Sequence, residues 1–113
     1  MCMGLAASLG MMAAGATGTA ITLCRGEHRA ISLTLGYFTL MEALQVAGYA
    51  TLDQCGSPVN NAVTLASYLH IAFQPLFINA FAMAIAPSAV SPALRRAVYA
   101  LAALATLALL VRL

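Results

Sequence analysis

The sequence predicts an all-α integral membrane protein, a bundle of about four transmembrane helices. Of its 113 residues, 63% are apolar and only 7% are charged, and the mean hydropathy is +0.93. Soluble domains are about 45–50% apolar, and a water-soluble chain of this length would leave much apolar surface facing water. Lipid is therefore the solvent that this composition fits.

Charged residues, prolines and glycines divide the chain into four apolar stretches. They cover residues 3–24, 30–52, 60–86 and 93–112. Each is close to the ~20 residues with which a helix crosses ~30 Å of hydrocarbon. Backbone groups in lipid must be paired within their own segment, so the stretches should be helices. We expect them to form a single transmembrane domain over residues 1–113.

The first stretch is rich in small residues. Ala6, Gly10, Ala14 and Gly18 recur every four positions along one ridge of a helix. Such ridges allow membrane helices to pack closely. The alternative is that small residues are simply common in membrane helices, and neither alternative indicates a function.

The second and third stretches each carry an ionisable residue near the centre of the membrane. Glu42 and His70 both lie fourteen residues from Gly56, on either side of it. In an antiparallel hairpin the two side chains would lie at the same depth, about 15 Å below the outer surface at 1.5 Å per residue. We expect Glu42 to approach His70 or Gln74 to about 2.7–3.2 Å between heavy atoms, or slightly more through one water.

Neighbouring polar residues extend this pattern along both helices. Steps of three and four residues connect Thr39, Glu42, Gln45 and Tyr49 on the second stretch, and Ser67, His70 and Gln74 on the third. Asn79 continues the second series if Pro75 kinks the helix.

An ionisable group at the bilayer centre costs about 2.5–3.5 kcal/mol on insertion scales, so it should face the interior and have a partner. The first hypothesis is a site that handles a proton, an ion or a small ligand, formed by Glu42, Gln45, His70, Gln74 and Asn79. The alternative is structural, because polar side chains also join helices by hydrogen bonds in membrane bundles.

Neither a metal nor another cofactor can be assigned from these residues. A Glu/His pair lacks the three protein ligands of a catalytic zinc, although Glu42, His70 and Gln74 with water could hold a metal weakly. A redox or chlorin ligand role for His70 would require a cavity. A membrane-embedded enzyme acting on lipid is the weakest alternative. Ser67 lies one helical turn from His70, but no G-x-S-x-G motif and no acidic orienting residue adjoins them.

The arginines predict the orientation. Four of the five Arg lie in or beside the connections around residues 25–29 and 87–96. Because Arg concentrates in cytoplasmic loops, these two connections should be cytoplasmic, and residues 53–58 and the N-terminus should be outside. The expected location is a bacterial inner membrane. Arg112 lies on the opposite side in this topology, so we expect further helices after residue 113 in a longer bundle.

The cysteines match no zinc-binding pattern. Cys2 and Cys55 fall on the outer side, where an oxidising compartment would allow a disulfide between them. Both could equally be small apolar fillers. Cys24 falls at the inner edge.

The expected partner is the lipid bilayer. The net charge of +2, with no Lys, is too small and scattered for nucleic acid. Other membrane subunits or further copies of the chain are expected if the protein is a structural or assembly subunit of a larger membrane complex, which is the second functional hypothesis.

Several short motifs resemble an uncharacterised family of polytopic, mostly bacterial membrane proteins over residues 1–86. They are Met1-Cys2, Arg25-Gly26-Glu27, Glu42, and the run from Leu69 through His70 and Gln74 to Pro75. The family differs after the Cys, where this chain has Met3 and Gly4. The resemblance implies a membrane fold and a longer chain, but no activity.

Overall fold

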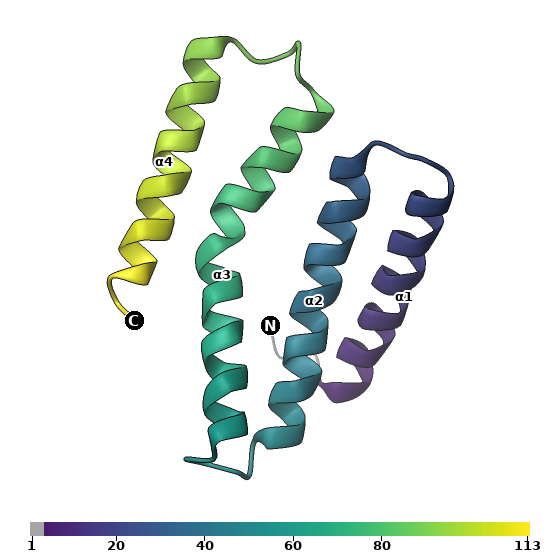
Figure 1. Cartoon of the computed structure of the whole chain (residues 1–113), viewed down its shortest axis with the longest axis vertical. Helices are drawn as coiled ribbons and strands as arrows, with labels where there is room; N and C mark the ends of the chain where they lie inside the picture. Colours follow the sequence, from purple (N-terminus) through teal and green to yellow (C-terminus); the bar gives the residue numbers. More distant parts are fainter. Residues whose placement is uncertain (1–3) are drawn as a thin grey trace. The chain divides into compact units, whose positions relative to one another are not determined.

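The structure is a computed structural model that describes residues 4–113. Within this range the chain forms four α-helices and no strand: α1 (Leu5–Cys24), α2 (Arg29–Thr51), α3 (Pro58–Ile85) and α4 (Pro92–Leu110) (Figure 1). The all-α prediction is confirmed, and each helix begins and ends within two residues of its predicted stretch.

All four helices are long and apolar enough to cross a membrane. The shortest, α4, has 19 residues. At 1.5 Å per residue it spans about 28 Å, close to the thickness of the hydrocarbon core.

Local sequence sets where the helices stop and start. After α1, Gly26 takes a positive φ of 66°. Its N–H donates to Leu23 O and the N–H of Glu27 donates to Thr22 O, so two terminal carbonyls of α1 are satisfied. At the start of α2, Nδ1 of His28 accepts from the N–H of Ala30. The first connection is therefore a closed, hydrogen-bonded turn.

Serine caps begin the last two helices. The Ser57 hydroxyl accepts from the N–H of Asn60 at the start of α3. The Ser91 hydroxyl accepts from the N–H of Leu94, and Pro92 occupies the first turn of α4. Both arrangements satisfy backbone donors that have no partner inside a helix.

The chain divides into two compact units, and the division falls inside α3. The first unit is Met1–Tyr68 and the second is Leu69–Leu113. The first holds α1, α2 and the beginning of α3, and the second holds the rest of α3 and α4. The single domain expected over residues 1–113 stays a prediction.

In the first unit, α1 packs against α2 in an antiparallel hairpin (Figure 1). Ser8 bonds to Gln45 near one end, and Thr22 bonds to Ser32 near the other. Between them α1 approaches α2 most closely at Gly15, where an added Cβ would meet the Thr39 hydroxyl and lie 3.3 Å from its Cβ. Ser8, Gly15 and Thr22, spaced seven residues apart, therefore form the side of α1 that packs against α2.

This packing face differs from the predicted ridge. Ala6, Gly10 and Ala14 are exposed, and only Gly18 of that ridge lies at the interface, where an added Cβ would lie 3.6 Å from Leu35 Cδ1. Small residues occur on two sides of α1. The side with hydroxyl groups packs on α2 because it can also form hydrogen bonds.

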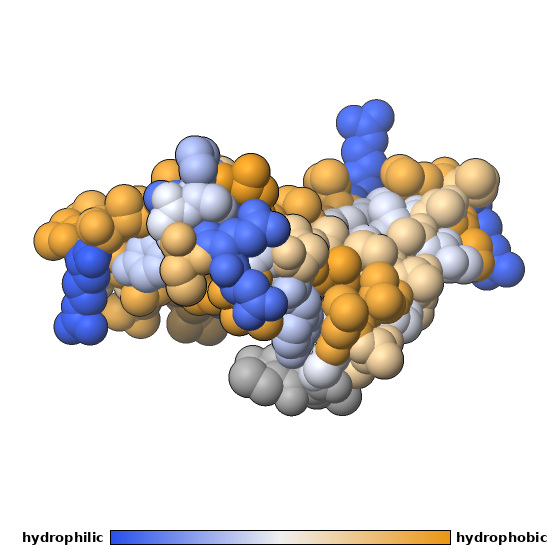
Figure 2. Space-filling model, turned by 90° about the horizontal axis from the view of Figure 1, so that it is seen from below, coloured by the Kyte–Doolittle hydropathy of each residue, from blue (hydrophilic) through white to orange (hydrophobic). Residues whose placement is uncertain are grey.

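Burial follows the pattern of a protein in lipid. Among residues 4–113, the buried apolar residues are Ala72, Met83 and Ala102, and the buried polar residues are Ser8, Ser32, Thr34, Thr51, His70 and Thr106. Large apolar side chains are exposed instead, such as Leu101 (68%) and Leu104 (62%). Figure 2 shows apolar residues, in orange, along the outer sides of the helices. Soluble proteins instead bury large apolar side chains and expose most polar ones.

Candidate mid-membrane polar site

Glu42 is the one charged residue between Ala30 and Leu52. It is half-buried and lies nine residues before the end of α2 at Thr51, which corresponds to about 14 Å along the helix. The Glu42 carboxyl therefore belongs to the middle part of an apolar helix.

Gln45, one turn after Glu42, has a partner on α1. The Ser8 hydroxyl donates to Oε1 of Gln45 at 3.1 Å, and Ser8 is only 2% exposed. Ser8 was not predicted as a member of the site. Ser8, Gly15 and Thr22 are spaced seven residues apart, and this repeat is the sequence signal that could have identified Ser8. The prediction instead followed the four-residue spacing of the other small residues of α1.

Glu42 has no such partner in its own unit. Within residues 4–68 its carboxyl forms no hydrogen bond and no ion pair. The register set by the Ser8–Gln45 and Gly15–Thr39 contacts puts Met11 and Met12 of α1 at the level of Glu42, and Met11 is exposed. Thioether sulfur is a weak acceptor and offers no proton, so α1 cannot satisfy a carboxyl here.

Two residues of the predicted polar series of α2 contact α1: Gln45 through Ser8 and Thr39 at Gly15. The Thr39 hydroxyl donates to Leu35 O at 2.7 Å. Thr34 lies eleven residues, or three turns, before Gln45. Thr34 is 7% exposed, and its hydroxyl has no hydrogen-bond partner within residues 4–113.

In the second unit, His70, Gln74 and Asn79 lie on α3. His70 is buried at 7% exposure, and Gln74, one turn later, is half-buried. Nδ2 of Asn79 donates to Pro75 O at 2.7 Å. Pro75 lies inside the continuous helix α3 and has no N–H for the carbonyl of Ile71. Asn79 therefore supports the backbone next to this proline.

The five predicted site residues belong to both units. Glu42 and Gln45 lie in the first, and His70, Gln74 and Asn79 lie in the second. The approach of Glu42 to His70 or Gln74 stays a prediction.

Residues 6–113 match the family of unknown function DUF5765. The chain belongs to this family. The match supports the predicted membership in an uncharacterised family and covers all four helices except Leu5, the first residue of α1. No curated protein and no solved structure matches the chain.

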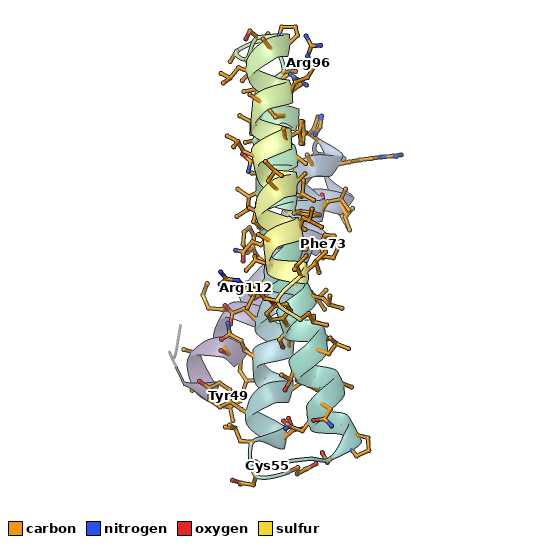
Figure 3. All side chains as sticks on the ribbon, turned by 90° about the vertical axis from the view of Figure 1, so that its left-hand side faces the viewer. Tyr49, Cys55, Phe73, Arg96 and Arg112 are labelled. Carbon is orange, nitrogen blue, oxygen red and sulfur yellow. The ribbon has the colours of Figure 1, made fainter. Side chains whose placement is uncertain are left out.

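In this DUF5765 chain, the remaining candidate chemistry is sparse. Within residues 4–113, no group of three or more His, Cys, Asp or Glu side chains could hold a metal ion. The Ser67 hydroxyl, considered above as a nucleophile, donates to Val63 O at 2.8 Å. Cys24 and Cys55 are both exposed, and Figure 3 shows Cys55 in the loop beyond Tyr49. Cys2 lies outside the described residues, so the Cys2–Cys55 disulfide stays a prediction.

The arginines of the DUF5765 chain lie at helix ends. Arg25 and Arg29 are exposed on either side of the first connection. Nη2 of Arg95 donates to Pro87 O at 2.8 Å, and Nε of Arg96 donates to Pro92 O at 3.4 Å. Figure 3 shows Arg96 and Arg112 at opposite ends of α4. Each guanidinium is thus placed outside the apolar middle of its helix.

Proposed function

We propose that this chain is a multi-pass membrane protein with a polar site at mid-membrane, at which Glu42, His70 and Gln74 bind a proton, a cation or a small polar ligand. One observation carries this proposal. The Glu42 carboxyl lies in the middle of an otherwise uncharged helix and forms no hydrogen bond or ion pair within residues 4–68.

A carboxyl in this position requires a partner. The cost of an ionised group at the bilayer centre is about 2.5–3.5 kcal/mol on insertion scales, and pairing reduces it. Since α1 offers Glu42 only methionines, the partner comes from α3, from another copy or subunit, or from a bound ligand. Of the polar residues of α3, we propose His70 and Gln74 as this partner, because an imidazole and an amide can both donate to a carboxylate, whereas the Ser67 hydroxyl already donates to Val63 O.

These three side chains suit proton or cation handling. A carboxyl and an imidazole can each take up and release a proton, and the Gln74 amide can donate and accept hydrogen bonds in either state. A carboxylate and an imidazole together are also ligands for a cation, with water completing the coordination. Gln45, held by Ser8, borders this site, and Asn79 supports α3 beside it.

The orientation follows from the arginines. We place the connections at residues 25–28 and 86–91 in the cytoplasm, and the N-terminus and residues 52–57 outside, in a bacterial inner membrane. Arg25 and Arg29 flank the connection after α1, and both are exposed.

An assembly subunit is the second candidate, and the ridge of Ala6, Gly10 and Ala14 favours it. These residues are exposed on the side of α1 away from α2, where a helix of another subunit or copy could approach. Glu42 would then bond to a second chain.

Native mass spectrometry after purification in mild detergent tests the two candidates. For a polar site we expect a retained metal or small molecule that is lost in Glu42→Gln and in His70→Ala. Glu27→Gln makes the same chemical change in the first connection and should retain it. If the site handles only protons, proteoliposomes with an internal pH-sensitive dye should show a flux that Glu42→Gln abolishes.

Two results would contradict the polar site. One is a wild-type protein that holds no ligand and moves no proton. The other is binding or flux that Glu42→Gln leaves unchanged. A chain that co-purifies only with other membrane subunits would instead support the assembly role.

A further inference from the structure

The α1–α2 hairpin carries two arginines with unused hydrogen-bonding groups at the first connection. Arg25 follows the last residue of α1, and Arg29 is the first residue of α2. Both side chains are exposed, and within residues 4–68 neither guanidinium forms a hydrogen bond or an ion pair. Their N–H groups are therefore available to a further partner.

Hydrogen bonds hold these two arginines at the same level of the hairpin. The Ser32 hydroxyl donates to the Thr22 hydroxyl at 3.0 Å, which joins α2 to α1. Arg25 lies three residues after Thr22, and Arg29 lies three residues before Ser32. The N–H of Glu27 also donates to Thr22 O, so the chain turns tightly between the helices. Because the axes of packed helices lie about 8–10 Å apart, both guanidinium groups can reach one bound group.

The positive charge of this connection is only partly balanced. Glu27 lies between the two arginines in the sequence, but it forms no ion pair with either of them. Arg29 occupies the first turn of α2, which has no acidic residue. The positive end of the helix dipole therefore adds to the charge of Arg29. An anion at this place would be attracted by both.

Exposed apolar side chains follow the arginines into both helices. They are Ile21 (47%) and Leu23 (63%) on α1 and Leu33 (62%) on α2, each within four residues of an arginine. A partner that contacts the arginines and these side chains must combine an anionic group with apolar chains. A phospholipid has this combination, whereas a free phosphate ion has only the anionic group.

The other arginines of the chain are arranged differently. Nη2 of Arg95 donates to Pro87 O, and Nε of Arg96 donates to Pro92 O. Arg112 is exposed, but the nearest arginine in the sequence is Arg96, at the opposite end of α4 (Figure 3). Arg112 is thus a single exposed guanidinium, with which the pair at the first connection can be compared.

We propose that Arg25 and Arg29 together bind the headgroup of an anionic phospholipid, whose acyl chains lie along the exposed apolar side chains of α1 and α2. The planar guanidinium group matches phosphate oxygens with two parallel N–H···O bonds, so two arginines can hold one headgroup from two sides. This lipid site is separate from the polar site at Glu42. It requires only that the chain lies in a membrane, which its four apolar helices fit.

Lipid titration followed by native mass spectrometry tests this site. The full chain in mild detergent is titrated with dioleoyl phosphatidylglycerol, which carries a single negative charge, or with zwitterionic dioleoyl phosphatidylcholine, which has the same acyl chains. The test variant combines Arg25→Gln with Arg29→Gln. Arg112→Gln is the matched control, because it removes an exposed guanidinium that has no neighbouring arginine. Circular dichroism checks that every variant keeps its helices.

We expect the wild type to bind phosphatidylglycerol at least about fivefold more tightly than phosphatidylcholine. The double variant should lose about tenfold to thirtyfold in affinity for phosphatidylglycerol, because each arginine near a membrane surface contributes about fivefold to the binding of anionic lipid. Arg112→Gln should lose less than about twofold. Glu27→Gln should bind phosphatidylglycerol more tightly than the wild type, because it removes the negative charge between the two arginines.

Three results would overturn the proposal. The first is equal affinity of the wild type for the two lipids. The second is an equal loss of phosphatidylglycerol affinity in Arg112→Gln and in the double variant. The third is a wild type that binds inorganic phosphate as tightly as phosphatidylglycerol, which would assign the arginines to a free anion. If the double variant did not fold, Arg25→Gln and Arg29→Gln tested singly should each lose about fivefold.

Discussion

The Ser8 hydroxyl donates a hydrogen bond to Oε1 of Gln45 at 3.1 Å, which joins a buried position of α1 to the polar side of α2. Together with Thr22–Ser32 and the contact of Gly15 with Thr39, it fixes the register of the hairpin at three levels. This register leaves Glu42 at the level of two methionines. The carboxyl must therefore find its partner away from α1.

The Ser8–Gln45 bond can be tested by stability. We expect Ser8→Ala to lower the free energy of unfolding by about 0.5–1.5 kcal/mol, because Gln45 loses its partner in a buried setting. Thr17→Ala is the control, since the exposed Thr17 hydroxyl bonds only to Ala13 O within its own helix. Unfolding in mixed micelles with increasing SDS would measure both. Equal stability of the two variants would contradict a role for this bond.

Two glycines of α1 should respond in opposite directions to alanine. Gly15→Ala would place a methyl group against Thr39, both side chain and backbone, and should destabilise the protein by about 1–3 kcal/mol through overpacking. Gly10 has no atom within 4 Å of an added Cβ, so Gly10→Ala should stabilise by up to about 1 kcal/mol through helix propensity. Thermal unfolding in detergent distinguishes them. A Gly15→Ala variant as stable as Gly10→Ala would show that α1 packs elsewhere.

The two exposed native cysteines report the orientation of the hairpin. With Cys2 replaced by Ser, we expect an impermeant maleimide added to intact cells to label Cys55, and to label Cys24 only after the membrane is permeabilised. The physical reason is that Arg25 and Arg29 lie close to Cys24 in the sequence, and arginine concentrates in cytoplasmic loops. The reverse order of labelling would invert the topology.

The helices could be predicted closely because lipid leaves few alternatives. A backbone in hydrocarbon must be hydrogen-bonded within its segment, so an apolar run of about 20 residues such as 93–112 is already a helix, here Pro92–Leu110. The ends also carried signals that act locally, such as Gly26 after α1 and Ser91 before Pro92.

The packing face of α1 could not be predicted in the same way. In water the apolar side of a helix marks its buried face, but α1 is apolar or small all around, so this signal is missing. The choice between the Ala6 ridge and the Ser8 side depends on α2, which supplies Gln45 as acceptor and Thr39 as the residue that fits Gly15.

The candidate site was predictable where polarity alone identifies a residue. Glu42, Gln45 and His70 stand out because each interrupts an apolar helix. Glu42 and Gln45 are half-buried and His70 is buried, while their meeting in one site stays a prediction. Ser8 and Thr34 were missed because a single hydroxyl can bond to its own helix and so carries little information.

The meeting of Glu42 and His70 is the central claim, and a double-mutant cycle tests it most directly. The free energy of unfolding would be measured for the wild type, Glu42→Gln, His70→Asn and the double variant, with Glu27→Gln in place of Glu42→Gln as the control cycle. We expect the effects of Glu42→Gln and His70→Asn to differ from additivity by about 0.5–3 kcal/mol, as contacting residues do. Additivity within about 0.3–0.5 kcal/mol, equal to the control cycle, would contradict the claim and place the partner of Glu42 elsewhere.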